Sequence, residues 1–162
     1  MYHSVSVDNF FACTFISIYS VILHMLYSGT SMFTATSPSI IDTNNIRFPT
    51  VLTNQGNDYN SSSGVFTCRI AGQYWFSASI AKSSSNNVGY TYCFIMINGS
   101  HKMQMRHYEV NPLHAIFSKT ASAGFLLNRG DRVQVGDCIN PGFLYNGGME
   151  SFFSGVLIKP DV

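Results

Sequence analysis

The sequence predicts an all-β domain, a sandwich or jelly roll of short antiparallel strands. Aromatic residues make up 14% of the 162-residue chain, which also has thirteen Gly and only five Pro, and this composition favours strands and tight turns. Several segments alternate apolar and polar residues with a period of two, the pattern of a strand with one buried face. Such segments recur at spacings of roughly ten to twenty residues, and none keeps a helical period for long.

The clearest alternating strand is predicted over residues 73–80. Apolar side chains form one face and polar side chains the other: Tyr74, Phe76, Ala78 and Ile80 against Gln73, Ser77 and Ser79. Trp75 interrupts the polar face, which indicates that this ring covers a second surface.

Four further strands follow from the turn chemistry between apolar runs. The run of residues 92–97 is apolar on both faces and ends at Asn98-Gly99, the strongest short hairpin signal. Strands at 123–127 and 132–135 flank the turn of residues 128–131, and the run 152–158 closes the chain. These strands, with polar turns between them, predict a two-layer fold with its core between the layers.

Length and charge limit the function. A chain of 162 residues suffices for one domain with a substantial core. Nine Lys and Arg against eight Asp and Glu give a net charge of +1 with no basic run, so nucleic acid is not an expected partner. With only 10% charged residues, the domain should keep apolar surface after its core is filled, and symmetric association would cover that surface.

Residues 1–31 are expected to be a leader that precedes the domain of residues 32–162. The run from Phe10 to Tyr27 carries no formal charge, and small residues follow it, as in a cleaved signal peptide. The fit is incomplete because Asp8 precedes the run and no Lys or Arg does. Eighteen residues also reach the lower limit for a spanning helix, so an uncleaved membrane anchor, or an apolar segment packed on the domain, stays open.

Two other features agree with an extracellular, secreted protein. Asn60 and Asn98 each begin a triplet that fits the N-glycosylation acceptor. The cysteines are Cys13, Cys68, Cys93 and Cys138, so removal of the leader would leave three, of which one would be free or intermolecular. Their spacing fits no zinc site.

A specific pattern runs from Phe48 to Phe76. It reads F-x5-N-x4-Y-x6-F-x5-G-x-Y-x-F, with the marked positions Phe48, Asn54, Tyr59, Phe66, Gly72, Tyr74 and Phe76. Further pieces follow in order, namely I-N-G, L-N-R-G-D-R-V and S-F-F-S-G-V-L. This pattern resembles the signature of the C1q globular domain, and the resemblance covers roughly residues 32–160. Ala78 stands where the family has another aromatic residue.

The resemblance implies a ten-stranded jelly roll, shared with tumour necrosis factor ligands, that assembles into a homotrimer. Tyr74, Phe76 and Phe153 are then candidates for the subunit core or the trimer axis. Cysteine usage departs from that of complement chains, whose resemblance implies a bridge from a cysteine near Cys93 to one about twenty residues downstream. That segment has no cysteine here, which puts a Cys93 bridge in doubt.

No catalytic motif is recognisable, and the chain is not expected to be an enzyme. No cofactor is expected, although the sequence is compatible with bound calcium. His101, His107 and His114 lie in one segment, but three spaced histidines are more often solvent-facing than metal-binding or pH-sensing. The Arg129-Gly130-Asp131 tripeptide falls on a predicted turn, where the C1q family commonly has Gly-Asp-x-Val, so the resemblance implies a structural turn in preference to integrin binding.

Two stretches with loop signals are candidate ligand-binding sites. One contains Lys102, Arg106, His107 and Tyr108, and the other contains Phe143, Tyr145 and Asn146. Arg and Lys suit a carboxylate or sulfate, and Tyr can stack on a sugar while it donates a hydrogen bond. A loop folded back over the core is an equally good interpretation of the second stretch.

No Gly-X-Y repeat precedes the domain, so a collagen stalk is not expected. The chain therefore resembles the stalkless secreted C1q proteins of invertebrates, which implies a trimeric, lectin-like pattern-recognition head for microbial glycans in innate immunity. A cytokine-like or extracellular-matrix ligand that binds a cell-surface protein receptor is the alternative.

Overall fold

The computed structural model describes residues 29–42, 45–82, 90–108, 116–145, 147 and 149–161. The chain divides into two units, residues 1–30 and 31–162, and most of the expected leader lies outside the described residues. The described part of the chain has no helix long and apolar enough to cross a membrane. The fold described below is that of the second unit.

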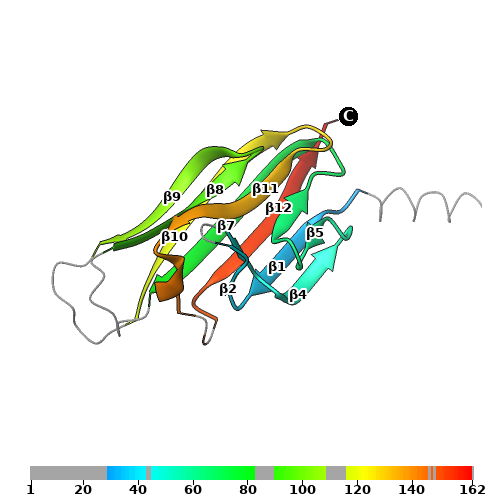
Figure 1. The fold of residues 1–162 in the computed structure, drawn as a ribbon. Coiled ribbons are helices and arrows are strands. Elements are labelled where there is room, and N and C mark those ends of the chain that lie inside the picture. The colour runs from blue at the N-terminus through cyan, green and yellow to red at the C-terminus, as the bar shows by residue number, and fades with distance from the viewer. Residues whose placement is uncertain are drawn as a thin grey trace, which may run out of the picture. The chain divides into compact units, whose positions relative to one another are not determined.

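Ten strands form two five-stranded antiparallel sheets that face each other (Figure 1). The first sheet has the order β10-β7-β12-β1-β4, built from β1 (Met32–Thr36), β4 (Thr50–Gln55), β7 (Gly72–Lys82), β10 (Phe117–Leu127) and β12 (Phe152–Pro160). The second has the order β5-β6-β11-β8-β9, built from β5 (Tyr59–Asn60), β6 (Val65–Thr67), β8 (Tyr90–Ile97), β9 (Ser100–Tyr108) and β11 (Arg132–Ile139). A ribbon of β2 (Ser39–Ile40) and β3 (Ile46–Arg47) and a short 3₁₀ turn, η1 (Pro141–Phe143), complete the described elements. The predicted ten-stranded jelly roll is confirmed.

The predicted strands are confirmed where a local pattern supported them. Along β7, buried and exposed side chains alternate from Gly72 to Phe76 as the period of two requires. The Asn98-Gly99 pair joins β8 to β9 with both residues at positive φ, the conformation that favours these two residue types. β10 ends at the predicted turn and β11 begins after it. β12, the last strand of the chain, lies between β7 and β1 in the first sheet.

Aromatic side chains fill the space between the two sheets. Phe33 stacks on Tyr59 with ring centroids 4.6 Å apart, and Phe153 packs edge-on against Phe33 at 4.9 Å. Phe66 from the second sheet meets Phe76 of the first at 5.2 Å. These contacts join the two sheets at several levels, and such ring pairs add stability beyond the area that they bury.

Tyr74, Phe76 and Phe153 lie in this core and not on a surface that could contact another subunit. All three are at most 1% exposed. Of the two positions expected for them, the subunit core is therefore the one observed. The trimer axis is not available to them because both sheets cover their side chains.

The signature residues have local structural roles. The Tyr59 hydroxyl donates a hydrogen bond to the Phe48 carbonyl at 3.1 Å, and the Phe48 amide lies 3.2 Å from the same oxygen. Asn54 forms two hydrogen bonds with the Tyr59 backbone: its Nδ2 donates to the carbonyl at 2.8 Å, and its Oδ1 accepts from the amide at 3.2 Å. Burial raises the pKa of Tyr59 to about 12, so the phenol stays protonated and keeps donating at neutral pH.

The doubt about a Cys93 bridge was wrong. Cys93 forms a disulfide with Cys138, which links the adjacent strands β8 and β11 across 45 residues of sequence. Cys68 is the free cysteine of the described residues, and it is buried. Its Sγ lies 3.1 Å from the Ile70 carbonyl, and desolvation raises the pKa of the thiol.

We expect Gly155→Ala to destabilise the domain because β12 passes close to two core rings. A Cβ at Gly155 would collide with the Phe76 ring and would lie 2.7 Å from Phe33, closer than carbon atoms can approach. Overpacking of this kind costs about 1–3 kcal/mol, which urea denaturation would measure. Gly142→Ala is the control, since a Cβ there has no neighbour within 4 Å, and an equal loss in both variants would contradict the prediction.

Candidate functional site

The first predicted ligand-binding stretch is a strand and not a loop. Lys102, Arg106, His107 and Tyr108 all lie on β9, an edge strand of the second sheet. Side chains on a strand point alternately to opposite faces, so these residues cannot all meet one ligand. Arg106 and Tyr108 are exposed on the outward face of the sheet, and Lys102 is exposed at the irregularity where β9 slips relative to β8.

His107 points into the sandwich, contrary to the expectation of a surface site. It is 7% exposed and its ring stacks on Phe117 with centroids 5.4 Å apart. His101 is exposed on the outward face, where its Nε2 lies 2.6 Å from Asp137 Oδ2. His114 lies outside the described residues, and these contain no cluster of three metal-ligating side chains.

A continuous set of rings covers the outward face of β8 and β9. We call it the aromatic face, and it consists of Tyr90, Tyr92 and Phe94 on β8 with His101, Arg106 and Tyr108 on β9. The ring centroids of Tyr90 and Tyr92 are 6.1 Å apart, and those of Tyr92 and Phe94 are 5.7 Å apart. The His101 ring stacks on Phe94 at 3.8 Å, almost parallel to it.

The register of the hairpin places one cation, Arg106, beside the rings of the aromatic face. Tyr90 is the cross-strand partner of Tyr108, and Tyr92 is the partner of Arg106. The Arg106 guanidinium carbon lies 5.7 Å from the centre of the Tyr92 ring, within range of a cation–π contact. Two predicted ligand residues, Arg106 and Tyr108, thus lie together with two tyrosines that were not predicted.

Tyr90 and Tyr92 could have been found from the sequence. The run Y-T-Y-C-F-I-M-I alternates, and its second, fourth, sixth and eighth residues face the core. Every ring of the run is therefore on the other face. The predicted strand that is apolar on both faces is confirmed, and its outward rings form a candidate binding surface that the alternation alone indicates.

The second predicted stretch folds back towards the core. After β11 the chain forms η1, Leu144 packs against the core, and the Tyr145 amide donates to the Ala81 carbonyl at 2.8 Å. Tyr145 is half-buried, Phe143 lies in η1, and Asn146 falls outside the described residues. The interpretation of a folded-back loop is the one that the described part of this stretch supports.

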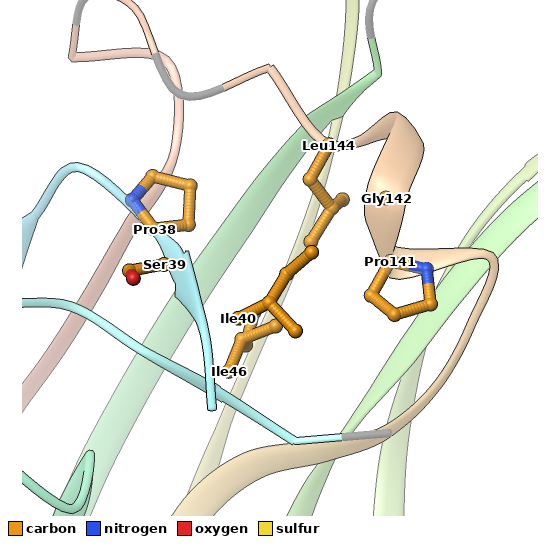
Figure 2. A pocket seen from close by; sticks show the side chains of 7 residues that line it. All are labelled: Pro38, Ser39, Ile40, Ile46, Pro141, Gly142 and Leu144. Carbon is orange, nitrogen blue, oxygen red and sulfur yellow. The ribbon is translucent and has the colours of Figure 1, made fainter. Parts of the chain in front are cut away.

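A hollow of about 350 Å³ lies between this stretch and the β2–β3 ribbon (Figure 2). Most of the residues that line it are apolar, and none has a charged side chain: Pro38, Ser39, Ile40, Ile46, Pro141, Gly142 and Leu144. Figure 2 shows Ile40 and Leu144 approaching from opposite sides. Such a lining offers few groups to orient a polar ligand.

A second uncovered surface lies on the other sheet. We call it the apolar face, and it consists of Trp75 on β7, Leu126 on β10 and Ile158 on β12. Their exposed fractions are 47%, 72% and 62%. Together with Gln73, Gly124 and Phe125 they line a shallow hollow of about 300 Å³. The second surface that Trp75 was expected to cover is therefore the outward face of the first sheet.

The integrin-like tripeptide and one glycosylation triplet form part of a single turn cluster. Asn98 Nδ2 donates to Asp131 Oδ1 at 2.8 Å, and Asn98 Oδ1 accepts from the Arg132 amide at 2.9 Å. The other Asp131 oxygen accepts from the Asn128 amide. The structural turn predicted for residues 129–131 is confirmed. Asn60 is exposed at the end of β5, where its Oδ1 closes a local turn.

Comparison with known proteins agrees with this architecture. A family model described as the C1q domain matches residues 30–158. The chain belongs to the C1q domain family. It is similar to a human complement C1q subcomponent protein, with 31% identity over 118 residues, covering 72% of this chain and 44% of that protein. A rat complement C1q subcomponent protein is 29% identical over 119 residues, with the same coverage.

This C1q domain protein spans less than half the length of those two relatives. Among solved structures, the globular domain of zebrafish complement 1qA matches with a TM-score of 0.61 and 19% identity, covering 82% of this chain and 99% of that one. Murine APRIL at pH 8.0 matches with a TM-score of 0.63 and 12% identity, covering 80% and 99%. These two likenesses show the fold alone.

We expect Asn98 and Asp131 to stabilise the C1q domain as a coupled pair. Asn98→Gly keeps the positive φ of this position accessible and removes both side-chain hydrogen bonds, which should cost about 1–2 kcal/mol. Asp131→Ala removes the same contact from the other side. In a double-mutant cycle measured by urea denaturation, the double variant should lose less stability than the sum of the two single losses, by about 0.5 kcal/mol or more. A loss equal to that sum would exclude the coupling.

Proposed function

We propose that this protein is an extracellular, non-enzymatic recognition protein whose C1q domain works as a homotrimer. The observation that carries the proposal is the apolar face. Trp75, Leu126 and Ile158 present three large apolar side chains on neighbouring strands of one sheet. Burial of such a side chain contributes about 1.5–3 kcal/mol, so an interface that covers this face has a substantial driving force.

Membership of the C1q domain family supports three copies around one axis. The apolar face is uncharged, since Trp75, Leu126 and Ile158 are joined there by Gln73, Gly124 and Phe125. Depletion of charge is typical of the centre of a protein–protein interface. When two different patches of the same subunit contact each other, repeated copies form a closed ring if each subunit is rotated by an integral fraction of a full turn. A trimer is the ring with a rotation of one third of a turn.

The ligand that we propose for the trimer is a microbial glycan. The aromatic face supports it, because Tyr90 and Tyr108 are exposed as cross-strand partners on a hydrogen-bonded hairpin and tyrosine rings suit the apolar faces of sugars. A trimer would carry three such faces. On a repetitive surface this arrangement gains roughly 10² to 10⁴ in avidity, so weak binding by each subunit would suffice.

The strongly perturbed titratable groups support a structural and not a catalytic role. Burial raises the pKa of Tyr59, Cys68 and Tyr74, and all three belong to the core. The Tyr74 hydroxyl donates to the Ile70 carbonyl at 2.7 Å. None of the three lines either of the hollows described above.

Leu126→Asp should convert the trimer to a monomer, because the interface would then bury a carboxylate without a partner. Leu126 is 72% exposed in the single subunit, so the variant should remain folded, with a melting temperature lowered only by the loss of association. Sedimentation at micromolar concentration would measure the association state. Leu52→Asp is the matched control, since Leu52 is 56% exposed on β4 at the far edge of the same sheet. A monomeric wild-type protein, or a trimeric Leu126→Asp variant, would contradict the proposal.

A glycan array probed with the wild-type trimer tests the ligand class. We expect binding to surface polysaccharides, with weaker retention of the monomeric Leu126→Asp variant because it lacks avidity. Absence of binding to every glycan, together with binding to receptor-bearing cells, would favour the protein-receptor alternative.

A further inference from the structure

We propose that the aromatic face is a binding site for polysaccharides that carry carboxylates, with sugar rings stacked on Tyr90 and Tyr108 and a carboxylate held by Arg106. The inference rests on the proposed glycan-binding function, and it identifies the site and the chemical class of the ligand. It differs from the sequence-based expectation, because the site is one face of a hairpin and includes neither His107 nor the 138–148 stretch.

The exposed rings are held in place by the scaffold. Tyr90 is 40% exposed and Tyr108 is 65% exposed, and the two are direct cross-strand partners. Beneath them, Thr91 and Cys93 face the core and are completely buried. The bridge from Cys93 to Cys138 ties β8 to its neighbour β11. The side chains of the site therefore lose little conformational entropy when a ligand binds to the rings, and this favours binding.

Arg106 is positioned to bind a carboxylate. Its guanidinium carbon lies 5.7 Å from the centre of the Tyr92 ring, within cation–π range, and this contact holds the cation beside the exposed rings. No carboxylate of the described residues forms an ion pair with it. A cation–π contact uses none of the guanidinium's N–H donors, and two parallel donors match the two oxygens of a carboxylate. The side chain is thus oriented by a contact that leaves its hydrogen-bonding edge available.

The charge of the surroundings favours an anionic over a neutral sugar. Asp137 is the carboxylate next to the aromatic face, and it is engaged by His101 at 2.6 Å. Lys102 is exposed on the same strand as Arg106 and is likewise without an ion pair among the described residues. Arg106 and Lys102 thus add to this strand two cations that have no ion pair in the described part of the chain, and they would attract an anionic chain.

The dimensions of the aromatic face fit an extended chain. Tyr90, Tyr92 and Phe94 lie at alternate positions of one strand, so the row is about 14 Å long at about 3.4 Å per residue. The stacked pair of Phe94 and His101 continues the row beyond Arg106. A row of this length offers contacts to consecutive sugar units, so a polymer should bind better than a single sugar.

The test compares a polyuronate with its neutral counterpart. We would measure binding of the trimer to polygalacturonate and to fully methyl-esterified polygalacturonate by biolayer interferometry. The wild-type protein should prefer the acid form, and Arg106→Ala should weaken that binding at least about tenfold because a charge-assisted hydrogen-bond pair is lost. Arg106→Lys should recover only part of the loss, since an ammonium lacks the planar fork.

Two further variants distinguish stacking on the aromatic face from non-specific electrostatic attraction. Tyr90→Ala should weaken binding of both forms, because stacking does not depend on the carboxylate. Arg129→Ala is the matched control, since Arg129 is exposed in the turn before β11 and should leave binding unchanged. Light scattering and melting temperature verify that each variant remains a folded trimer.

Three results would overturn the inference. Unchanged binding in both Arg106→Ala and Tyr90→Ala would place the glycan site elsewhere and leave the proposed glycan binding intact. Equal binding of the acid and the ester would exclude carboxylate recognition. A loss in Arg129→Ala as large as that in Arg106→Ala would indicate unspecific polyanion binding. Absence of binding to any polysaccharide would instead reject the proposed function itself.

Discussion

The stack of aromatic rings between the sheets is the interaction on which the rest of the structure depends. Phe33 contacts Tyr59 and Phe66 of the second sheet and Phe153 of its own, so one ring connects three strands besides its own. β12 follows a path so close to these rings that Gly155 has no room for a side chain. The separation of the sheets is therefore set by rings that interlock, and the fold tolerates little change in their volume.

The same core determines which residues remain for association and binding. Every strand that sends alternate side chains into the stack must send the others outwards. On β7 this rule buries Tyr74 and Phe76 and exposes Trp75, and on β8 it buries Cys93 and exposes Tyr90. The two uncovered surfaces are thus a consequence of core packing combined with a sequence that is rich in rings on both faces of its strands.

Local patterns predicted the strands, whereas the candidate site depends on pairings between distant segments. The composition of β9 favours a loop, because five of its nine residues are His, Lys, Arg or Gln. Met103, Met105 and His107 nevertheless alternate with Gln104, Arg106 and Tyr108, so the strand signal was present. The Cys93–Cys138 bridge had no such signal, because it depends on β11 lying beside β8.

Placing the two surfaces on different sheets has a functional consequence. The apolar face belongs to the sheet of β7, β10 and β12, and the aromatic face to that of β8 and β9. Since the core lies between the sheets, their outward faces point away from each other. A trimer built through the apolar face would leave three aromatic faces on its outside, pointing away from the shared axis. Substitutions that alter ligand preference can then accumulate on β8 and β9 without weakening the association that supplies avidity.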